Sequence, residues 1–240
     1  MGRKVGSLLL SAGVAVTAGC LALITPAPAL AIPEADAIKK LQVVPVFVIT
    51  DDKGVPLPIP RDKTLVLPLY LESAKARQEL ASLKKSNPSL KVDVVAVPLN
   101  VMNEKVAALS QQLKDKTQKL VAPVVGNDAD RSQAVKLLKA QGLTDQQIKE
   151  GLNVPVFFTK PFLTFKTPDG PRGVFFFSYE SLENALARLP VAEREKLKPQ
   201  VADLTAVLRE IAKAPTDSFV IYPTPEYFRL VQENKDKAAK

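Results

Sequence analysis

The chain has 240 residues, a formal net charge of +8, 46% hydrophobic residues, one cysteine and no histidine. Without histidine it cannot hold a Ser-His-Asp triad or a histidine-ligated metal, and it lacks Gly-x-Ser-x-Gly, Gly-x-Gly-x-x-Gly and P-loop patterns. We therefore expect a binding protein and not an enzyme, with no catalytic residues, metal or cofactor. Basic and acidic residues are interspersed, so nucleic acid is not an expected partner, whereas peripheral contact with an anionic membrane stays open.

Residues 1–31 are predicted to be a secretory signal peptide. Arg3 and Lys4 precede an apolar stretch from Leu8 to Ile24, and Ala29-Leu30-Ala31 fits the small-x-small pattern of a cleavage site. Cleavage after Ala31 leaves 240 − 31 = 209 residues with a charge of 8 − 2 = +6 and no cysteine. Two alternatives stay open: lipid attachment at Cys20, and an uncleaved anchor, because the stretch is near the ~18-residue lower limit of a span.

The mature chain contains an internal repeat. Val44-Pro45-Val46-Phe47 recurs as Val154-Pro155-Val156-Phe157, and each copy is expected to open an apolar strand. A turn follows each strand, at 51–54 and at 167–170, and each turn ends in a glycine that suits a left-handed backbone. The acidic pair Asp51 and Asp52 is interpreted as part of the first turn, because calcium requires six to eight oxygen ligands.

Each turn leads to a second strand and then a helix. The strands are expected at Thr64 to Leu71 and at Gly173 to Phe177. The first helix is expected from about Ser73 to Lys85, with Ser73 as its cap, and its counterpart starts near Ser178.

A third strand in each copy ends in proline and passes into another helix. These strands are expected at Val94 to Pro98 and at Phe219 to Pro223, and Thr224-Pro225 is a strong helix start. The offset between the copies grows from 155 − 45 = 110 to 223 − 98 = 125. We attribute the growth to an additional stretch, Ala192 to Ala214, whose apolar residues at helical spacing predict a helix.

The predicted fold is α/β, with two related strand-turn-strand-helix-strand-helix units packed as a pseudo-twofold single domain over 32–233. Unit one spans about 41–120, a connector 121–151 and unit two 152–233, and residues 234–240 form a frayed polar tail. The connector is predicted to hold a helix from Asp130 to Gln141 that stops at Gly142. A second short helix follows the capping box Thr144-Asp145-Gln146-Gln147.

Nine of the ten phenylalanines lie between Phe157 and Phe228. In the strand at 173–177, side chains alternate, so Phe175 and Phe177 share one side while Val174 and Phe176 share the other. On the facing hairpin arm, Leu163 and Phe165 share a side, and Phe162 takes the opposite one. Two interpretations follow: a strand buried on both faces by helices, or an apolar groove for unfolded chain. The candidate groove residues are Phe162, Phe165, Val174, Phe175 and Phe177.

Several of these stretches together resemble a known family. They are the two Val-Pro-Val-Phe openings, the turn Asp51-Asp52-Lys53-Gly54, the strand Val174 to Ser178, and Val220-Ile221-Tyr222-Pro223-Thr224-Pro225-Glu226. The chain resembles the family of the 22-kilodalton Tic component, the soluble intermembrane-space factor of chloroplast protein import, and its cyanobacterial relatives. Lys160-Pro161-Phe162 and the stretch Ala192 to Ala214 depart from that pattern.

The resemblance implies a chaperone-like, polypeptide-binding factor in the periplasm or thylakoid lumen that assists translocation or outer-membrane biogenesis. Unfolded precursors or outer-membrane proteins, and the outer-membrane assembly barrel, would be its partners. The family supplies no catalytic residues to carry over. An alternative from the residues themselves is a carrier for a small apolar ligand, enclosed by the same phenylalanines.

Overall fold

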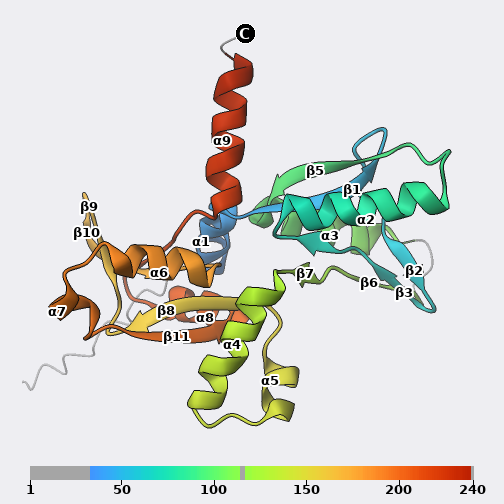
Figure 1. The fold of residues 1–240 in the computed structure, drawn as a ribbon. Coiled ribbons are helices and arrows are strands. Elements are labelled where there is room, and N and C mark those ends of the chain that lie inside the picture. Colours follow the sequence, from blue (N-terminus) through green and yellow to red (C-terminus); the bar gives the residue numbers. More distant parts are fainter. Residues whose placement is uncertain (1–32, 114–116, 239–240) are drawn as a thin grey trace, which may run out of the picture.

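The computed structural model describes residues 33–113 and 117–238, which form two lobes side by side (Figure 1). The predicted signal peptide and Cys20 lie outside these residues. Helices and strands are mixed along the chain, so the predicted α/β class is confirmed. Among the described residues, none of the helices has the length and apolar character needed to cross a bilayer.

The N-terminal half forms the blue and green lobe of Figure 1. Its strands make a four-stranded sheet in the order β5-β1-β4-β7 and a three-stranded sheet in the order β2-β3-β6. The elements are α1 (Glu34–Lys39), η1 (Lys40–Val43), β1 (Pro45–Asp51), β2 (Ile59–Arg61), β3 (Thr64–Val66), β4 (Leu69–Tyr70), α2 (Ser73–Ser86), β5 (Val92–Pro98), α3 (Leu99–Gln112), β6 (Lys119–Val121), β7 (Val124–Val125), α4 (Asp128–Ala140) and α5 (Asp145–Gly151).

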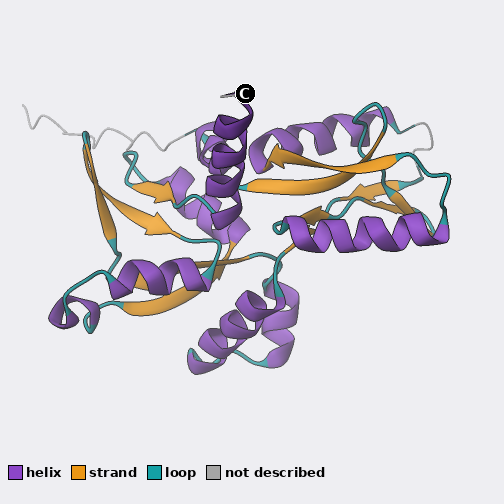
Figure 2. Ribbon diagram, turned by 45° about the horizontal axis from the view of Figure 1, so that its top comes forward, coloured by secondary structure: helices purple, strands orange, loops and turns teal. Residues whose placement is uncertain are grey.

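The C-terminal half forms the other lobe, with sheets in the orders β12-β10-β9 and β11-β8 (Figure 2). An isolated bridge between Phe157 and Phe176 joins these two sheets. The elements are β8 (Pro155–Lys160), β9 (Thr164–Thr167), β10 (Gly170–Phe175), α6 (Tyr179–Ala187), α7 (Val191–Arg194), β11 (Lys198–Asp203), α8 (Leu204–Lys213), β12 (Phe219–Ile221) and α9 (Pro225–Ala238).

The two halves share one order of strand pairing, but the predicted match of their third strands is wrong. β1 pairs antiparallel with β5, and β8 pairs antiparallel with β11. Each pair ends where a helix begins: the N–H groups of Leu99 in α3 and Leu204 in α8 donate to Val44 O and Val154 O at 2.8 and 2.9 Å. Pro98 therefore corresponds to Asp203, an offset of 203 − 98 = 105, and not to Pro223.

The continuous helix predicted over Ala192 to Ala214 is also wrong, because this stretch holds the end of α7, all of β11 and all of α8. β11 is the partner strand of β8 and not an insertion. The strand that follows α8 is β12, which pairs parallel with β10 as β6 pairs parallel with β3. A twofold relation between the halves, and the unit boundaries, stay predictions.

Local backbone signals account for most of the turns and helix ends. Gly54 and Gly170 adopt positive φ angles of 75° and 120°, as predicted for the two turns. Thr144 and Gln147 form the predicted capping box of α5, and Thr224 Oγ1 accepts a hydrogen bond from the N–H of Tyr227 at 3.3 Å. Two predictions are corrected: Glu72, not Ser73, occupies the cap position of α2, and residues 234–238 continue α9 where a frayed tail was expected.

The apolar side chains divide into three clusters because successive residues of a strand point to opposite faces of its sheet. Val46 and Val48 of β1 join Val156 of β8 in a central cluster between the lobes. Phe157 of β8 lies in a second cluster beneath α4 and α6, and Phe47 of β1 lies in a third cluster beneath α2. The central cluster draws on both halves, which explains why the lobes form one body.

One helix of each half, α4 in the first and α9 in the second, packs against the other half. In α4, Ala134 and Leu138 pack into the cluster of the C-terminal lobe, while Leu230 of α9 packs against the cluster around Phe47 and Tyr70 in the N-terminal lobe. In Figure 1, α9 stands over the line between the lobes and α4 lies on the opposite side.

We call α4 and α9 the exchanged helices, because each packs against the half of the chain to which it does not belong. An acidic side chain of each accepts a hydrogen bond from that other half. Asp130 of α4 accepts a hydrogen bond from the N–H of Tyr179 at the start of α6, at 2.7 Å. Glu226 of α9 accepts one from the N–H of Ser73 at the start of α2, at 2.9 Å, and Arg229 donates to Ser73 Oγ at 2.8 Å. Free N–H groups at a helix start favour a carboxylate partner, so the first turn of each exchanged helix caps a helix of the opposite lobe.

Candidate functional site

The strand predicted to line an open groove is part of the core. Val174, Phe175 and Phe177 are 0%, 2% and 5% exposed. Val174 lies in the cluster of the C-terminal lobe, while Phe175 and Phe177 lie in the central one. The predicted alternation of sides is therefore confirmed, and burial on both faces is the correct interpretation. These three residues do not line an open groove.

The other two candidate residues have different surroundings. Phe162 is half-buried, and its ring contacts Phe158, Phe175 and Phe219 with centroid distances of 5.2–5.5 Å, so it extends the core. Phe165 is 36% exposed and contacts Tyr222 edge to face at 5.8 Å. Since truncating a buried phenylalanine costs about 3–5 kcal/mol, loss of binding in a Phe175 variant would report unfolding.

The structure instead shows an apolar groove between the two lobes. It has a volume of about 980 Å³ and lies between α1, α3, α8 and the segment around β7. α3 and α8 are the helices that follow the paired strands β5 and β11, so they hold matching places in the two halves. No motif in the sequence indicates this site, because its walls come from segments about 100 residues apart.

Buried leucines form the floor of the groove and half-exposed side chains form its walls. Leu41, Leu69, Leu99 and Leu204 are 3–8% exposed and belong to the central cluster. Above them, the apolar wall residues are Ile38, Val106, Ala122, Val124, Leu208 and Ala212. The polar and charged residues that line the groove are exposed, and they are Glu34, Asn103, Thr205, Arg209 and Lys213. Such a groove can bind apolar side chains of a polypeptide without selecting one sequence.

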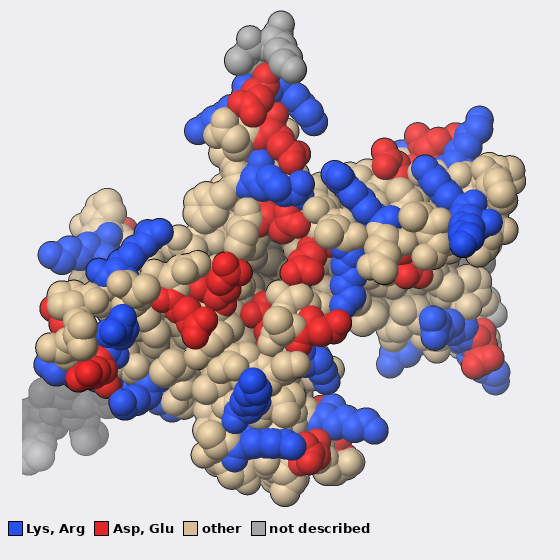
Figure 3. All heavy atoms as spheres, viewed as in Figure 1, with Lys and Arg blue, Asp and Glu red and all other residues tan. Residues whose placement is uncertain are grey.

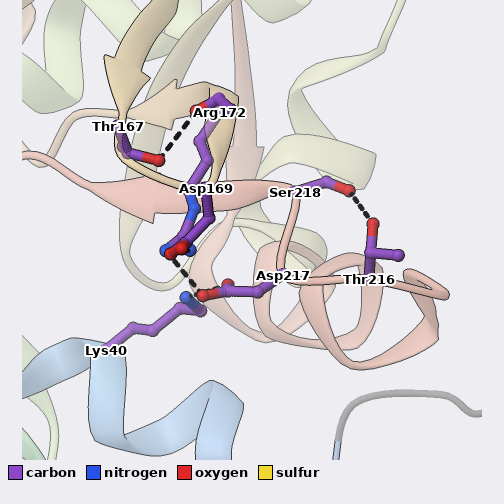
Figure 4. Close-up of polar contacts among 8 residues, drawn as sticks. Lys40, Thr167, Asp169, Arg172, Thr216, Asp217 and Ser218 are labelled. Atoms are coloured by element: carbon purple, nitrogen blue, oxygen red, sulfur yellow. Dashed lines mark hydrogen bonds and ion pairs between the residues drawn. The ribbon is translucent and has the colours of Figure 1, made fainter.

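One wall of the groove is the short helix α1, which an ion-pair network holds in place (Figure 4). Ala37 and Leu41 bury their side chains in the central cluster, while Lys40 reaches across to pair with Asp217, in the loop between α8 and β12. Asp217 also pairs with Arg172 of β10 at 2.6 Å, and Arg172 pairs with Asp169 at 2.9 Å. The N-terminal segment is thereby fixed to the C-terminal lobe beside the groove.

Charged side chains of both signs are exposed on the surface (Figure 3). Lys and Arg side chains are scattered among acidic ones over the face shown in Figure 3. In the first turn, Asp51 Oδ1 accepts hydrogen bonds from the N–H groups of Lys53 and Val55 at 2.9 and 2.8 Å, which confirms the turn interpretation. Residues 33–113 and 117–238 contain no group of three or more potential metal ligands.

The surroundings of the Asp130 carboxyl group raise its pKa. Burial raises the pKa of Asp130, the nearby Glu72 and Glu180 raise it further, and hydrogen bonds from Tyr179 N–H and Asn127 oppose the rise. The native state therefore binds this proton more tightly than the unfolded state does. The resulting stabilisation is complete below the pKa of an unfolded aspartate, about 3.9, and is lost as pH rises through the native pKa.

We expect Asp130→Asn to remove this contribution. The free energy of unfolding of each protein is measured by urea denaturation between about pH 3 and pH 7. The quantity to compare is the wild-type value minus the variant value, because this difference cancels the pH dependence that the two proteins share. This difference should fall as pH rises, although the variant also loses about 1 kcal/mol from its bond to Asn127 at every pH. A difference that rises with pH would contradict the assignment.

Comparisons with known proteins agree with this architecture. Two solved structures share the fold: "Anabaena Tic22 (protein transport)", with a TM-score of 0.67, 22% identity and coverage of 84% of this chain and 97% of that chain, and "Tic22 from Plasmodium falciparum", with a TM-score of 0.64, 18% identity and coverage of 83% and 98%. No curated protein matches the sequence. The family described as the Tic22-like family matches residues 11–233. The chain therefore belongs to the Tic22-like family.

Proposed function

We propose that the protein binds unfolded polypeptide segments in its apolar groove and assists protein transport in the periplasm or the thylakoid lumen. The groove between α3 and α8 is the observation that carries the proposal, because it gathers apolar walls over a leucine floor. Membership of the Tic22-like family supports it, as does the protein-transport role of the similar Anabaena protein. The predicted signal peptide supports the compartment.

The size of the groove sets the expected affinity. Burying one large apolar side chain contributes about 1.5–3 kcal/mol, and micromolar binding requires about −8 kcal/mol. A groove of about 980 Å³ accommodates several such side chains, and the ordering of a flexible client opposes part of their contribution. Binding is therefore micromolar at best and tolerant of sequence, which is what transient escort of many clients requires.

The proposed clients are unfolded precursors or outer-membrane proteins, with the outer-membrane assembly barrel as the receiving partner. An assay of aggregation suppression tests the client role, with the processed protein (residues 32–240) mixed with an unfolded outer-membrane protein. Suppression should increase with protein concentration in the micromolar range, and a photo-crosslinker at Leu208 should label the client. A protein that neither delays aggregation nor crosslinks at concentrations well above the micromolar range would refute this role.

A second function is favoured by the groove volume, because small-molecule sites commonly measure about 300–1,000 Å³. The groove would then hold a small apolar ligand instead of a polypeptide. Native mass spectrometry of the protein isolated from its own host distinguishes the two, since a carrier would retain one lipid or pigment per chain.

A further inference from the structure

Strand β9 presents an open edge in the C-terminal lobe. It is the end strand of the sheet β12-β10-β9 among the described residues. The N–H of Val174 donates to Leu163 O at 3.1 Å, and hydrogen-bonded pairs alternate along an antiparallel ladder. Lys166 lies opposite Pro171, which has no N–H to donate, so this pair is not hydrogen bonded. The backbone N–H and C=O groups of Thr164 and Lys166 therefore point away from β10, toward the open side.

A pocket lies directly beside this edge. It has a volume of about 520 Å³ and lies between β9, α6 and the start of α9. One wall is aromatic: the ring centroid of Tyr222 lies 5.8 Å from that of Phe165 and 6.0 Å from that of Phe228. Aliphatic surface comes from Leu163, Ala185 and Leu189. Phe165 and Phe228 are 36% and 51% exposed, so this wall faces solvent. The pocket is separate from the groove, which shares none of its residues.

The charged groups of the pocket favour an anionic partner. Arg188 is the one charged residue that lines it, and it forms no ion pair with any described residue. Lys166, on the open edge of β9, also forms no ion pair within the described part of the chain. Glu180 and Glu183 belong to α6, but neither contributes to the pocket lining. A carboxylate next to an apolar anchor would therefore meet an unpaired guanidinium group.

We propose that β9 and its pocket form a second polypeptide-binding site, which takes an extended segment as an added strand. Backbone groups of the segment pair with Thr164 and Lys166, and one bulky apolar side chain enters the pocket. A carboxylate two residues away, which points to the same side of an extended segment, pairs with Arg188. That the ligand is a polypeptide rests on the proposed function, but the surface that binds it and the way it binds differ from those of the groove. The groove, whose walls are mostly helices, binds mainly through apolar surface, whereas the edge site selects a client segment by its extended conformation and its charge.

The test measures fluorescence anisotropy of a labelled ten-residue peptide of alternating threonine and serine, with one central phenylalanine and a glutamate two residues after it, so that both side chains point to the same side. A second peptide replaces glutamate with lysine, and a third carries N-methyl groups on the edge-pairing N–H groups. With the processed protein, the glutamate peptide should bind at least fivefold more tightly than the lysine peptide. N-methylation should weaken its binding at least tenfold, because it removes the donors of the added strand.

Two variants locate the site. Arg188→Glu should reverse the preference between the glutamate and lysine peptides, which a loss of folding cannot do. Lys166→Pro should abolish binding by removing an outward N–H, while its control Lys166→Ala should keep it. Equal binding of the N-methylated peptide, or an unchanged charge preference in Arg188→Glu, would overturn the edge site. If the edge site is absent but the groove binds clients, the protein still suppresses client aggregation. The two proposals can therefore fail independently, and the two assays distinguish them.

Discussion

Leu208→Asp in the groove should reduce the affinity for an unfolded client at least tenfold. Leu208 is a half-exposed residue on the α8 wall, and replacing it removes about 1.5–3 kcal/mol of apolar contact and places a charge where a client would be dehydrated. Val106→Asp on the opposite α3 wall should have the same effect. The measurement is the concentration of protein that halves the aggregation rate of an unfolded outer-membrane protein.

The matched control is Val55→Asp, which introduces the same charge at a residue that is 46% exposed and outside the groove. This variant should suppress aggregation as well as the wild type does. Circular dichroism and urea denaturation of all three variants separate loss of binding from loss of structure. Equal losses in the Val55 and Leu208 variants would show that net charge and not the groove controls suppression.

Removal of α9 should destabilise the N-terminal lobe, although α9 belongs to the other half of the chain. A protein that ends at Pro223 loses the carboxylate of Glu226 and the guanidinium of Arg229 from the start of α2. It also loses the contact of Leu230 with the cluster around Phe47 and Tyr70. Charge-assisted hydrogen bonds contribute about 1.5–3 kcal/mol, and exposed apolar surface adds to the loss. The total decrease in the free energy of unfolding should be about 3–5 kcal/mol.

Hydrogen exchange measured by mass spectrometry locates this effect. Amides of α2 and β1 should exchange faster in the truncated protein, while those of α6, whose first N–H is bonded by Asp130 of α4, should change least. The double variant Glu226→Gln/Arg229→Gln provides a milder control. Its α2 and β1 amides should also exchange faster than in the wild type, but by less than in the truncated protein. Faster exchange confined to the C-terminal lobe would contradict the exchanged arrangement.

Short sequence motifs correctly predicted the turns and helix starts that they form. The capping box at Thr144, the turn glycines and the proline start of α9 depend on neighbours within four residues, so each is visible in the sequence. The stretch 192–214 was misassigned because Leu197, Val201, Leu204 and Leu208 have helical spacing. Pairing of β11 with β8, about 40 residues earlier, overrides that spacing. Asp203 was a usable signal, because its carboxylate caps α8 by accepting the N–H of Thr205 at 2.9 Å.

The candidate site depended on contacts that the sequence does not encode locally. Alternation in β10 was predicted correctly, yet whether Phe175 faces solvent depends on Val156 and Leu204, which pack in the same cluster. The groove arises where α3 and α8 meet above a shared floor, and neither helix has a distinctive motif. Phe165 lines the pocket beside β9, because its strand lies at the end of its sheet.

The exchanged helices also determine when the protein can finish folding. A chain delivered from its N-terminus presents β1 and α2 early, but the residues of α9 that contact them belong to its final described segment, the 14 residues Pro225–Ala238. Until that segment arrives, the start of α2 lacks the bonds from Glu226 and Arg229, and the cluster around Phe47 and Tyr70 lacks its contact with Leu230. The N-terminal lobe therefore cannot complete its own contacts until the last part of the chain has been delivered.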